Sequence, residues 1–111
     1  DWSGQILVPG LVSPIAAPGR VRAELSRAER TGTTVHVARA RLLDSDTAMD
    51  AARDVAEALT DDMLGVLWDA STVLVMRHTP IDLAQLPEPR HVEWSMSEST
   101  GPSDLEALVA A

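Results

Sequence analysis

Hydrophobic periodicity is clearest in the middle of the chain, over Thr33–Arg77. Apolar residues alternate with polar or small ones along Thr34–Leu42, which is typical of a half-buried β-strand. They recur at three- and four-residue steps across Thr47–Thr60, which predicts an amphipathic helix. Two β-rich runs follow in Leu64–Arg77 with a short polar stretch between them. This pattern indicates a hairpin, the alternative being one long bent strand.

The segment Arg20–Arg30 fits a strand period and a helical period equally well. We predict a helix, because the segment is dominated by Ala, Glu and Arg, which favour helices. Gly32 follows at the position where a C-terminal cap belongs. The later helix has its own start signal: Thr47 and Asp50 form a loose capping box, in which Thr47 would accept a hydrogen bond from a first-turn amide.

The two ends of the chain carry shorter patterns. Asp1–Gly4 is expected to be a frayed terminus. Gln5–Val8 is an apolar run closed by Pro9–Gly10, and it predicts a first strand. Near the other end, His91–Met96 alternates apolar and polar residues and predicts an edge strand. A capping box then opens a terminal helix over Ser103–Ala111.

The order of these elements predicts an α/β fold for the whole chain. Strands alternate with helices as β-α-β-α-β-β, followed by the edge strand and the C-terminal helix. Such alternation favours parallel pairing with right-handed crossovers, so we expect a mixed sheet of about four to five strands with helices on its faces. A chain of 111 residues is expected to form a single domain.

Composition removes several kinds of chemistry. The chain contains no Cys, so thiol catalysis and disulfides are excluded, and no Lys, so a Schiff base or a P-loop lysine is excluded as well. Phe and Tyr are also missing, and the core must be built from Val, Leu, Ala and Met around three Trp. The sequence shows no membrane span and no signal peptide, and it begins without Met. We therefore expect a processed product, a domain, or the soluble part of a longer protein.

Charge is distributed unevenly along the chain. The formal net charge is −8, yet residues 20–41 hold six Arg against two Glu, so that this stretch is net +4 and the remainder net −12. A strongly acidic body argues against general nucleic-acid binding, which depends on neutralising phosphates. The Arg-rich stretch would either meet an acidic partner or a phosphate, or form a solvated helix face with arginines at a strand end.

Three aspartates are the candidate metal ligands. Asp61 and Asp62 follow the second predicted helix, and Asp69 lies between the two runs of the hairpin. If they met at one sheet edge they would offer the carboxylate oxygens that Ca²⁺ or Mg²⁺ prefers. The alternative is that all three are solvated loop acids. The three histidines show no metal-ligand spacing, and the chain has no glycine-rich phosphate loop.

The candidate partner-binding residues are apolar and lie near the ends of the chain. Trp2 is hard to bury so close to a terminus and is a candidate anchor on a partner. Val92, Trp94 and Met96 form an apolar row on the predicted edge strand, and an exposed edge invites pairing with another chain. Alternatively, the terminal helix Ser103–Ala111 would fold back over that row and close it.

One stretch resembles a known family. Residues 20–77 are similar to the TPM domain, the family of thylakoid-lumen photosystem-repair proteins and bacterial membrane-anchored relatives. The likeness rests on a helix, an Arg-Thr-Gly turn, a strand, a second helix and a strand that starts a hairpin: Arg20–Arg30, Arg30–Gly32, Thr33–Ala38, Ala51–Leu59 and Gly65–Leu67. It implies an extracytoplasmic, membrane-tethered domain. Some family members are phosphatases and others are accessory or assembly factors, and the family's acidic loop would correspond to Asp61 and Asp62.

These observations favour a non-enzymatic interaction or accessory domain without a cofactor, the soluble part of a larger or membrane-tethered assembly. Its partner would be another protein chain, with self-association as one form. The first alternative is a phosphatase-like domain that depends on Ca²⁺ or Mg²⁺ held by Asp61, Asp62 and Asp69. The second is a small-ligand-binding domain at strand ends near Pro9–Gly10 and Asp44. The location would be extracytoplasmic if the resemblance holds and cytoplasmic otherwise.

Overall fold

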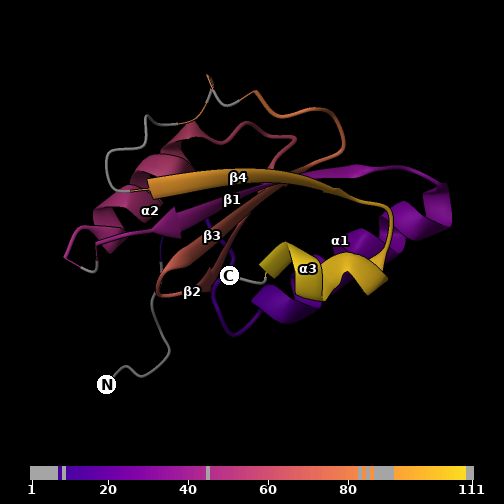
Figure 1. Ribbon diagram of the computed structural model, residues 1–111, viewed down its shortest axis with the longest axis horizontal. Helices are drawn as coiled ribbons and strands as arrows, with labels where there is room; N and C mark the ends of the chain where they lie inside the picture. The colour runs from indigo at the N-terminus through magenta and orange to yellow at the C-terminus, as the bar shows by residue number, and fades with distance from the viewer. Residues whose placement is uncertain are drawn as a thin grey trace.

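The computed structural model describes residues 8, 10–44, 46–82, 84, 86 and 92–109. Figure 1 shows its helices and strands, which follow one another as α1 (Ala17–Thr31), β1 (Val35–Leu42), α2 (Ala48–Ala58), β2 (Leu64–Asp69), β3 (Thr72–Arg77), β4 (Val92–Ser99), the short 3₁₀ helix η2 (Pro102–Asp104) and α3 (Leu105–Val109). The predicted central strand, both long helices, the hairpin and the late strand are therefore confirmed, with ends that shift by a few residues.

The strands form one four-stranded sheet in the order β2-β3-β1-β4, and every neighbouring pair is antiparallel. The prediction of a mixed sheet with parallel pairing is wrong. The predicted helical crossover is nevertheless present, because β1 and β2 run in the same direction and are joined through α2. The hairpin then returns β3 into the space between them, and β3 runs against both neighbours.

The predicted first strand falls mainly outside the described residues. Gln5, Ile6 and Leu7 are not described, and Val8 is buried in the core without belonging to a strand. In its place Val12 forms a single parallel bridge with β2: the Val12 N–H donates to the Gly65 carbonyl and the Leu67 N–H donates to the Val12 carbonyl, each at 2.9 Å. This bridge covers part of the outer edge of β2.

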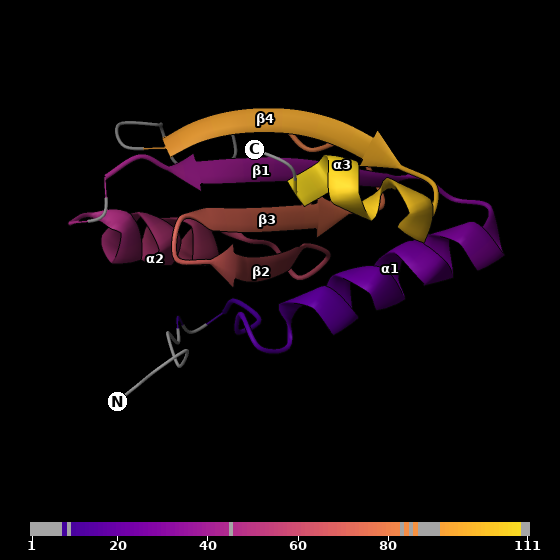
Figure 2. The ribbon, with the colours of Figure 1, turned by 60° about the horizontal axis from the view of Figure 1, so that its bottom comes forward.

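The sheet is covered by helices on both faces, because β1 is apolar on both. Val35 and Val37 point to the face that carries α1 and α3, while Ala38 and Ala40 point to the face that carries α2 (Figure 2). Each face has its own hydrophobic cluster, and the buried helix residues that close the two clusters are Val21, Leu25 and Ala28 of α1, Leu108 of α3, and Ala48, Ala52 and Val55 of α2. The result is a three-layer α/β/α sandwich.

The C-terminal end of α1 follows the sequence prediction. Gly32 has a left-handed backbone with φ of 68°, which favours glycine. The next amide, Thr33 N–H, donates to the Ala28 carbonyl at 2.9 Å, and the Gly32 N–H donates to the Glu29 carbonyl at 3.4 Å. These two bonds satisfy carbonyls at the helix end that would otherwise lack partners.

The start of α2 differs from the prediction. Thr47 occupies the N-cap position but makes no side-chain capping bond, because its backbone (φ −109°, ψ 1°) is not in the extended conformation that a capping residue normally adopts. Its hydroxyl instead donates to the Asp44 carbonyl at 3.5 Å. The Asp44 side chain accepts a bond from the Asp46 N–H at 2.9 Å. The turn between β1 and α2 is therefore held by Asp44 rather than by a capping box.

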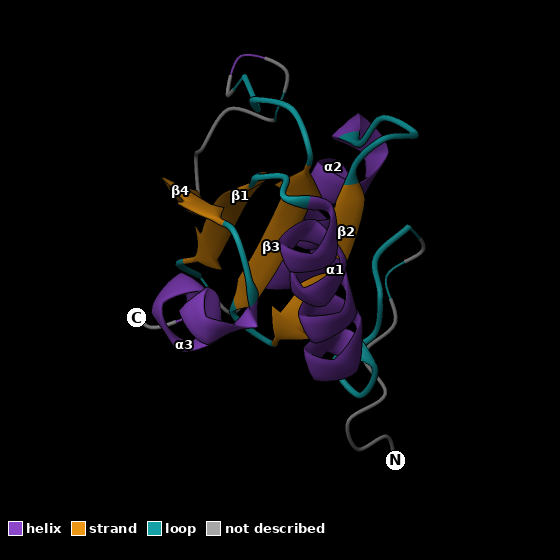
Figure 3. Ribbon diagram, turned by 90° about the vertical axis from the view of Figure 1, so that its right-hand side faces the viewer, coloured by secondary structure: helices purple, strands orange, loops and turns teal. Residues whose placement is uncertain are grey.

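The terminal helix does not cover the apolar row of β4. Leu105 and Leu108 of α3 belong to the hydrophobic cluster on the α1 side of the sheet, and α3 lies beside α1 (Figure 3). Val92 and Trp94 belong to the cluster on the opposite, α2 side. The alternative in which the terminal helix folds over Val92, Trp94 and Met96 is therefore wrong for its described part, because that row and α3 lie on opposite faces. The last two residues of the predicted helix Ser103–Ala111 lie outside the described residues.

The packing predicts opposite effects for alanine at two glycines. A Cβ at Gly65 would meet the side chains of Leu59 and Leu11, the latter at 2.6 Å, so both leucines would have to move. We expect Gly65→Ala to lower the free energy of unfolding by about 1–3 kcal/mol. Gly19 lies inside α1 with open space around it, and Gly19→Ala should raise stability by about 0.5–1 kcal/mol. Urea denaturation measures both, and an unchanged stability of Gly65→Ala would contradict this packing.

Candidate interaction surface

Strand β4 is an edge of the sheet, as its sequence pattern predicts. It pairs with β1 on one side only, from Val35 opposite Ser99 to Leu42 opposite Val92. No other described strand lies beyond it (Figure 2). His91, the first residue of the predicted strand, lies outside the described residues.

Hydrogen-bond direction shows which backbone groups of β4 point outward. The Leu42 N–H donates to the Ser71 carbonyl at 2.7 Å, so even-numbered residues of β1 bond toward β3 and odd-numbered residues bond toward β4. In the register with β4, odd residues face odd ones, as in Val37 opposite Ser97. The backbone groups of the even-numbered residues Trp94, Met96 and Glu98 therefore point away from the sheet.

The apolar row along β4 becomes more exposed toward Met96. Val92 is buried opposite Leu42, Trp94 is half-buried opposite Ala40, and Met96 is 43% exposed opposite Ala38. All three point to the α2 side, where the small alanines of β1 leave room for the Trp94 ring. The predicted apolar row is therefore present, but only its Met96 end is exposed to a partner.

A hollow of about 380 Å³ lies beside the exposed end of this row. Its walls come from β1, β4 and the segment after β3, and the residues that line it are His36, Pro80, Ile81, Met96, Ser97 and Glu98. Ile81 is buried, and the Glu98 carboxylate lies 3.5 Å from His36 Nδ1 across the two strands. The hollow therefore has apolar and polar lining residues, and it lies next to the open edge of the sheet at β4.

This hollow is the feature that sequence reasoning missed. Only the register of β1 with β4 places His36 opposite Glu98, and only the path of the chain after β3 brings Ile81 to Met96. The alternation of β1 does put His36 on the same face as Ala38, so the sequence indicates the face of the sheet on which His36 lies but not its neighbours.

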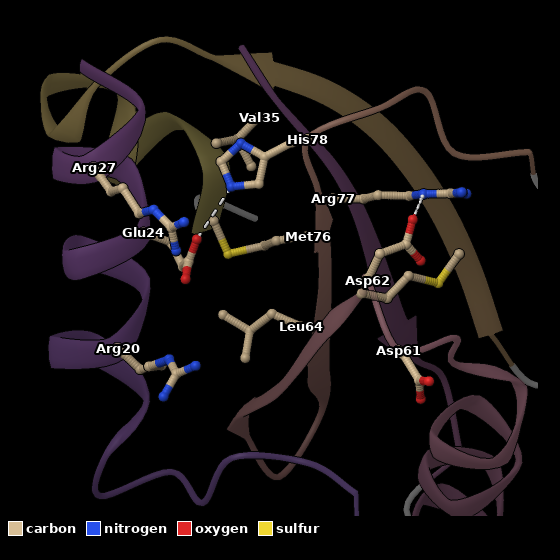
Figure 4. Close-up of a pocket in the computed structure, with 11 residues that line it drawn as sticks. Arg20, Glu24, Arg27, Val35, Asp61, Asp62, Leu64, Met76, Arg77 and His78 are labelled. Atoms are coloured by element: carbon tan, nitrogen blue, oxygen red, sulfur yellow. Dashed lines mark hydrogen bonds and ion pairs between the residues drawn. The ribbon is translucent and has the colours of Figure 1, made fainter. Parts of the chain in front are cut away.

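A second hollow, of about 220 Å³, lies between α1 and the loop before β2. Figure 4 shows Arg20, Glu24 and Arg27 projecting from α1 toward an apolar floor that includes Leu64 and Met76. Much of the charge around this hollow is paired: Glu24 Oε2 lies 3.3 Å from His78 Nε2, and Arg77 Nε donates to Asp62 Oδ2 at 2.8 Å.

The Arg-rich stretch does not form one basic surface. Its first part lies on α1, beside the second hollow, whereas Arg39 and Arg41 lie on β1, where Arg41 is 3.9 Å from Glu93. The acidic side chains Glu24 and Glu93 are mixed among these arginines. The structure therefore favours a solvated helix face with arginines on a strand over a single phosphate site.

The three aspartates of the predicted metal site are not brought together. Asp61 and Asp62 precede β2, while Asp69 ends it, and the length of the strand separates them by roughly 20 Å. Asp69 Oδ1 accepts bonds from the Ser71 N–H at 2.8 Å and the Ser71 hydroxyl at 3.1 Å, which hold the hairpin turn. Across the described residues, no group of three or more His, Asp or Glu could hold a metal ion.

The predicted ligand site at the strand ends is likewise not assembled. Gly10 packs against Ala56, near the end of α2, whereas Asp44 lies in the turn that precedes α2. Helix α2 is roughly 16 Å long and separates the two. Pro9 and the predicted anchor Trp2 lie outside the described residues.

Comparison with known proteins adds no relative: the chain matches no protein-family model, no curated protein and no solved structure. The resemblance to the TPM domain stays a prediction, and so does the location that it implies. Among the described helices, none has the length and apolar character needed to cross a bilayer.

Asp62 lies beside the second hollow, and its carboxylate accepts hydrogen bonds from two neighbouring side chains. A hydrogen bond from the Thr60 hydroxyl, assisted by the Arg77 guanidinium, holds the pKa of Asp62 below its ordinary value, and partial desolvation opposes this effect. A depressed carboxyl pKa adds stability above the unfolded-state value, and that stability is lost as the pH falls through the folded-state value.

We expect Thr60→Val to raise the pKa of Asp62 toward its ordinary value, because the substitution removes the hydroxyl donor with little change of shape. The pKa is read from the side-chain carboxyl carbon shift during an NMR pH titration. Thr72→Val, at the far end of the hairpin, is the matched control and should leave the titration of Asp62 in place. A pKa of Asp62 that is the same in Thr60→Val as in the original chain would contradict this assignment.

Proposed function

We propose that this domain is a non-enzymatic interaction module, an accessory part of a larger assembly, that binds another protein chain by adding a strand to β4. The outward-pointing backbone groups of Trp94, Met96 and Glu98 are the observation that supports it most directly. Unpaired N–H and C=O groups on an edge strand are a ready template for a further strand.

The two edges of the sheet differ in a way that favours β4. On β2, the Gly65 carbonyl and the Leu67 N–H are already bonded to Val12. On β4, the described residues offer no such partner to the even-numbered positions, and the strand has neither a proline nor a bulge over Val92–Ser99 that would blunt it.

Side chains beside the β4 edge supply the selectivity that backbone bonds lack. A strand added to β4 would send alternate side chains toward the α2 face, where they meet Trp94, Met96 and the neighbouring hollow. The other side chains would meet Glu93, Ser95 and Ser97, which are exposed and polar. A partner segment with alternating apolar and polar residues fits this surface.

Amide exchange tests whether the edge is open. In dilute, isolated protein we expect the amides of Trp94, Met96 and Glu98 to exchange much faster than those of Glu93, Ser95 and Ser97, which bond to β1. Exchange followed by NMR resolves each amide. Equal protection of both sets would mean that the edge is already closed, and the proposal would fail.

A pair of variants at Glu98 tests strand addition itself. Glu98→Ala and Glu98→Pro both remove the carboxylate near His36, but only proline also removes the outward N–H. With a photoreactive residue in place of Met96, we expect cross-links to a discrete partner in an extract of the source organism. Proline at position 98 should reduce them by roughly tenfold relative to alanine.

The control places the photoreactive residue at Glu57, an exposed position of α2 on the far side of the helix from the core. Cross-links of the same species from positions 57 and 96 would indicate non-specific contact. Equal yields from Glu98→Pro and Glu98→Ala would show that binding does not use the backbone of β4, and would refute strand addition.

A further inference from the structure

We infer that the strand added to β4 is β4 of a second copy of this chain. The two strands would run antiparallel about a two-fold axis that passes between the two Ser95 residues. This inference rests on the proposed function and names its partner. It would join two four-stranded sheets into one continuous antiparallel sheet with α2 of both copies on the same face.

Hydrogen-bond geometry limits the registers that two copies can adopt. The outward groups belong to even-numbered residues, so an even residue of one copy must face an even residue of the other. An axis at Glu93 or at Glu98 would set a glutamate opposite itself. The remaining registers that pair more than one residue of β4 are centred on Trp94, Ser95, Met96 or Ser97.

The register centred on Ser95 is the most self-complementary of these. It overlaps the strands over Val92–Glu98 and sets Trp94 opposite Met96 twice. An axis at Trp94 overlaps only Val92–Met96, while an axis at Met96 places Trp94 opposite a glutamate. An axis at Ser97 pairs Met96 with a glutamate. Self-complementarity is what an interface between identical surfaces requires.

The side chains fit this register on both faces of the sheet. On the α2 face, the partner's Trp94 would lie against Met96, at the mouth of the hollow that Pro80 and Ile81 line. On the other face, Glu93 would lie opposite Ser97 of the second copy. Glu98 would lie opposite Val92, so no acid faces an acid.

The charge of the whole chain opposes this association and makes it sensitive to salt. Each copy carries a formal charge of −8, and the two bodies repel one another. Added salt screens that repulsion, whereas it would weaken contacts between opposite charges. The pairing of two copies should therefore strengthen as sodium chloride rises.

Two cysteine substitutions test the register directly, because the chain has no cysteine of its own. In the proposed dimer the two Ser95 residues form a non-hydrogen-bonded pair with Cα atoms about 4.5 Å apart, within disulfide range. The two Ser97 residues would be roughly 14 Å apart, which is out of range. Both serines are exposed, so neither substitution should disturb the fold.

We expect Ser95→Cys to form a disulfide-linked dimer in a glutathione redox buffer, faster in high salt, and Ser97→Cys to remain a monomer. Non-reducing electrophoresis and mass spectrometry measure both. Equal dimer formation by the two variants, or none by either, would overturn the inference. The photo-cross-linking experiment separates this inference from the proposed function. If the cysteine variants form no dimer but position 96 cross-links to a different protein, strand addition to β4 is supported and only the second copy is refuted. If position 96 gives no cross-link either, both proposals are refuted.

Discussion

The fold depends on strand β1, which is hydrogen-bonded to β3 on one side and to β4 on the other. Its odd-numbered residues Val35 and Val37 anchor the cluster under α1 and α3, and its even-numbered residues Ala38 and Ala40 anchor the cluster under α2. Both cores therefore share one strand. Because β1 has two strand neighbours and β4 has one, the same pairing that completes the sheet leaves β4 as its open edge.

The local elements could be predicted from the sequence because their signals are local. The period of Thr34–Leu42, the apolar stripe of α2 and the glycine after α1 each depend on neighbouring residues only. The sheet order could not be predicted in this way. An alternating order of strands and helices suggests parallel neighbours, and nothing local in the hairpin reveals that β3 returns between β1 and β2.

For the candidate sites too, local features could be predicted from the sequence and long-range arrangement could not. The apolar row of β4 was predictable, since it follows from a period of two, whereas the aspartate cluster was not assembled because Asp62 and Asp69 lie at opposite ends of β2. The predicted capping box of α2 was wrong for a local reason, the backbone angles of Thr47, which the sequence alone does not reveal. The hollow beside Met96 needed both strand register and the path after β3, which are long-range properties.

The proposed interaction surface is strand β4, and its proposed occupant is a second copy of this chain. A dilution series followed by amide NMR shifts, from millimolar to micromolar protein at high salt, tests this most directly. We expect concentration-dependent shifts at Trp94, Met96 and Glu98 and along the neighbouring hollow, with no change around the second hollow beside Arg20 and Arg27. Shifts centred on the second hollow, or spectra that do not change with concentration, would contradict the proposed dimer.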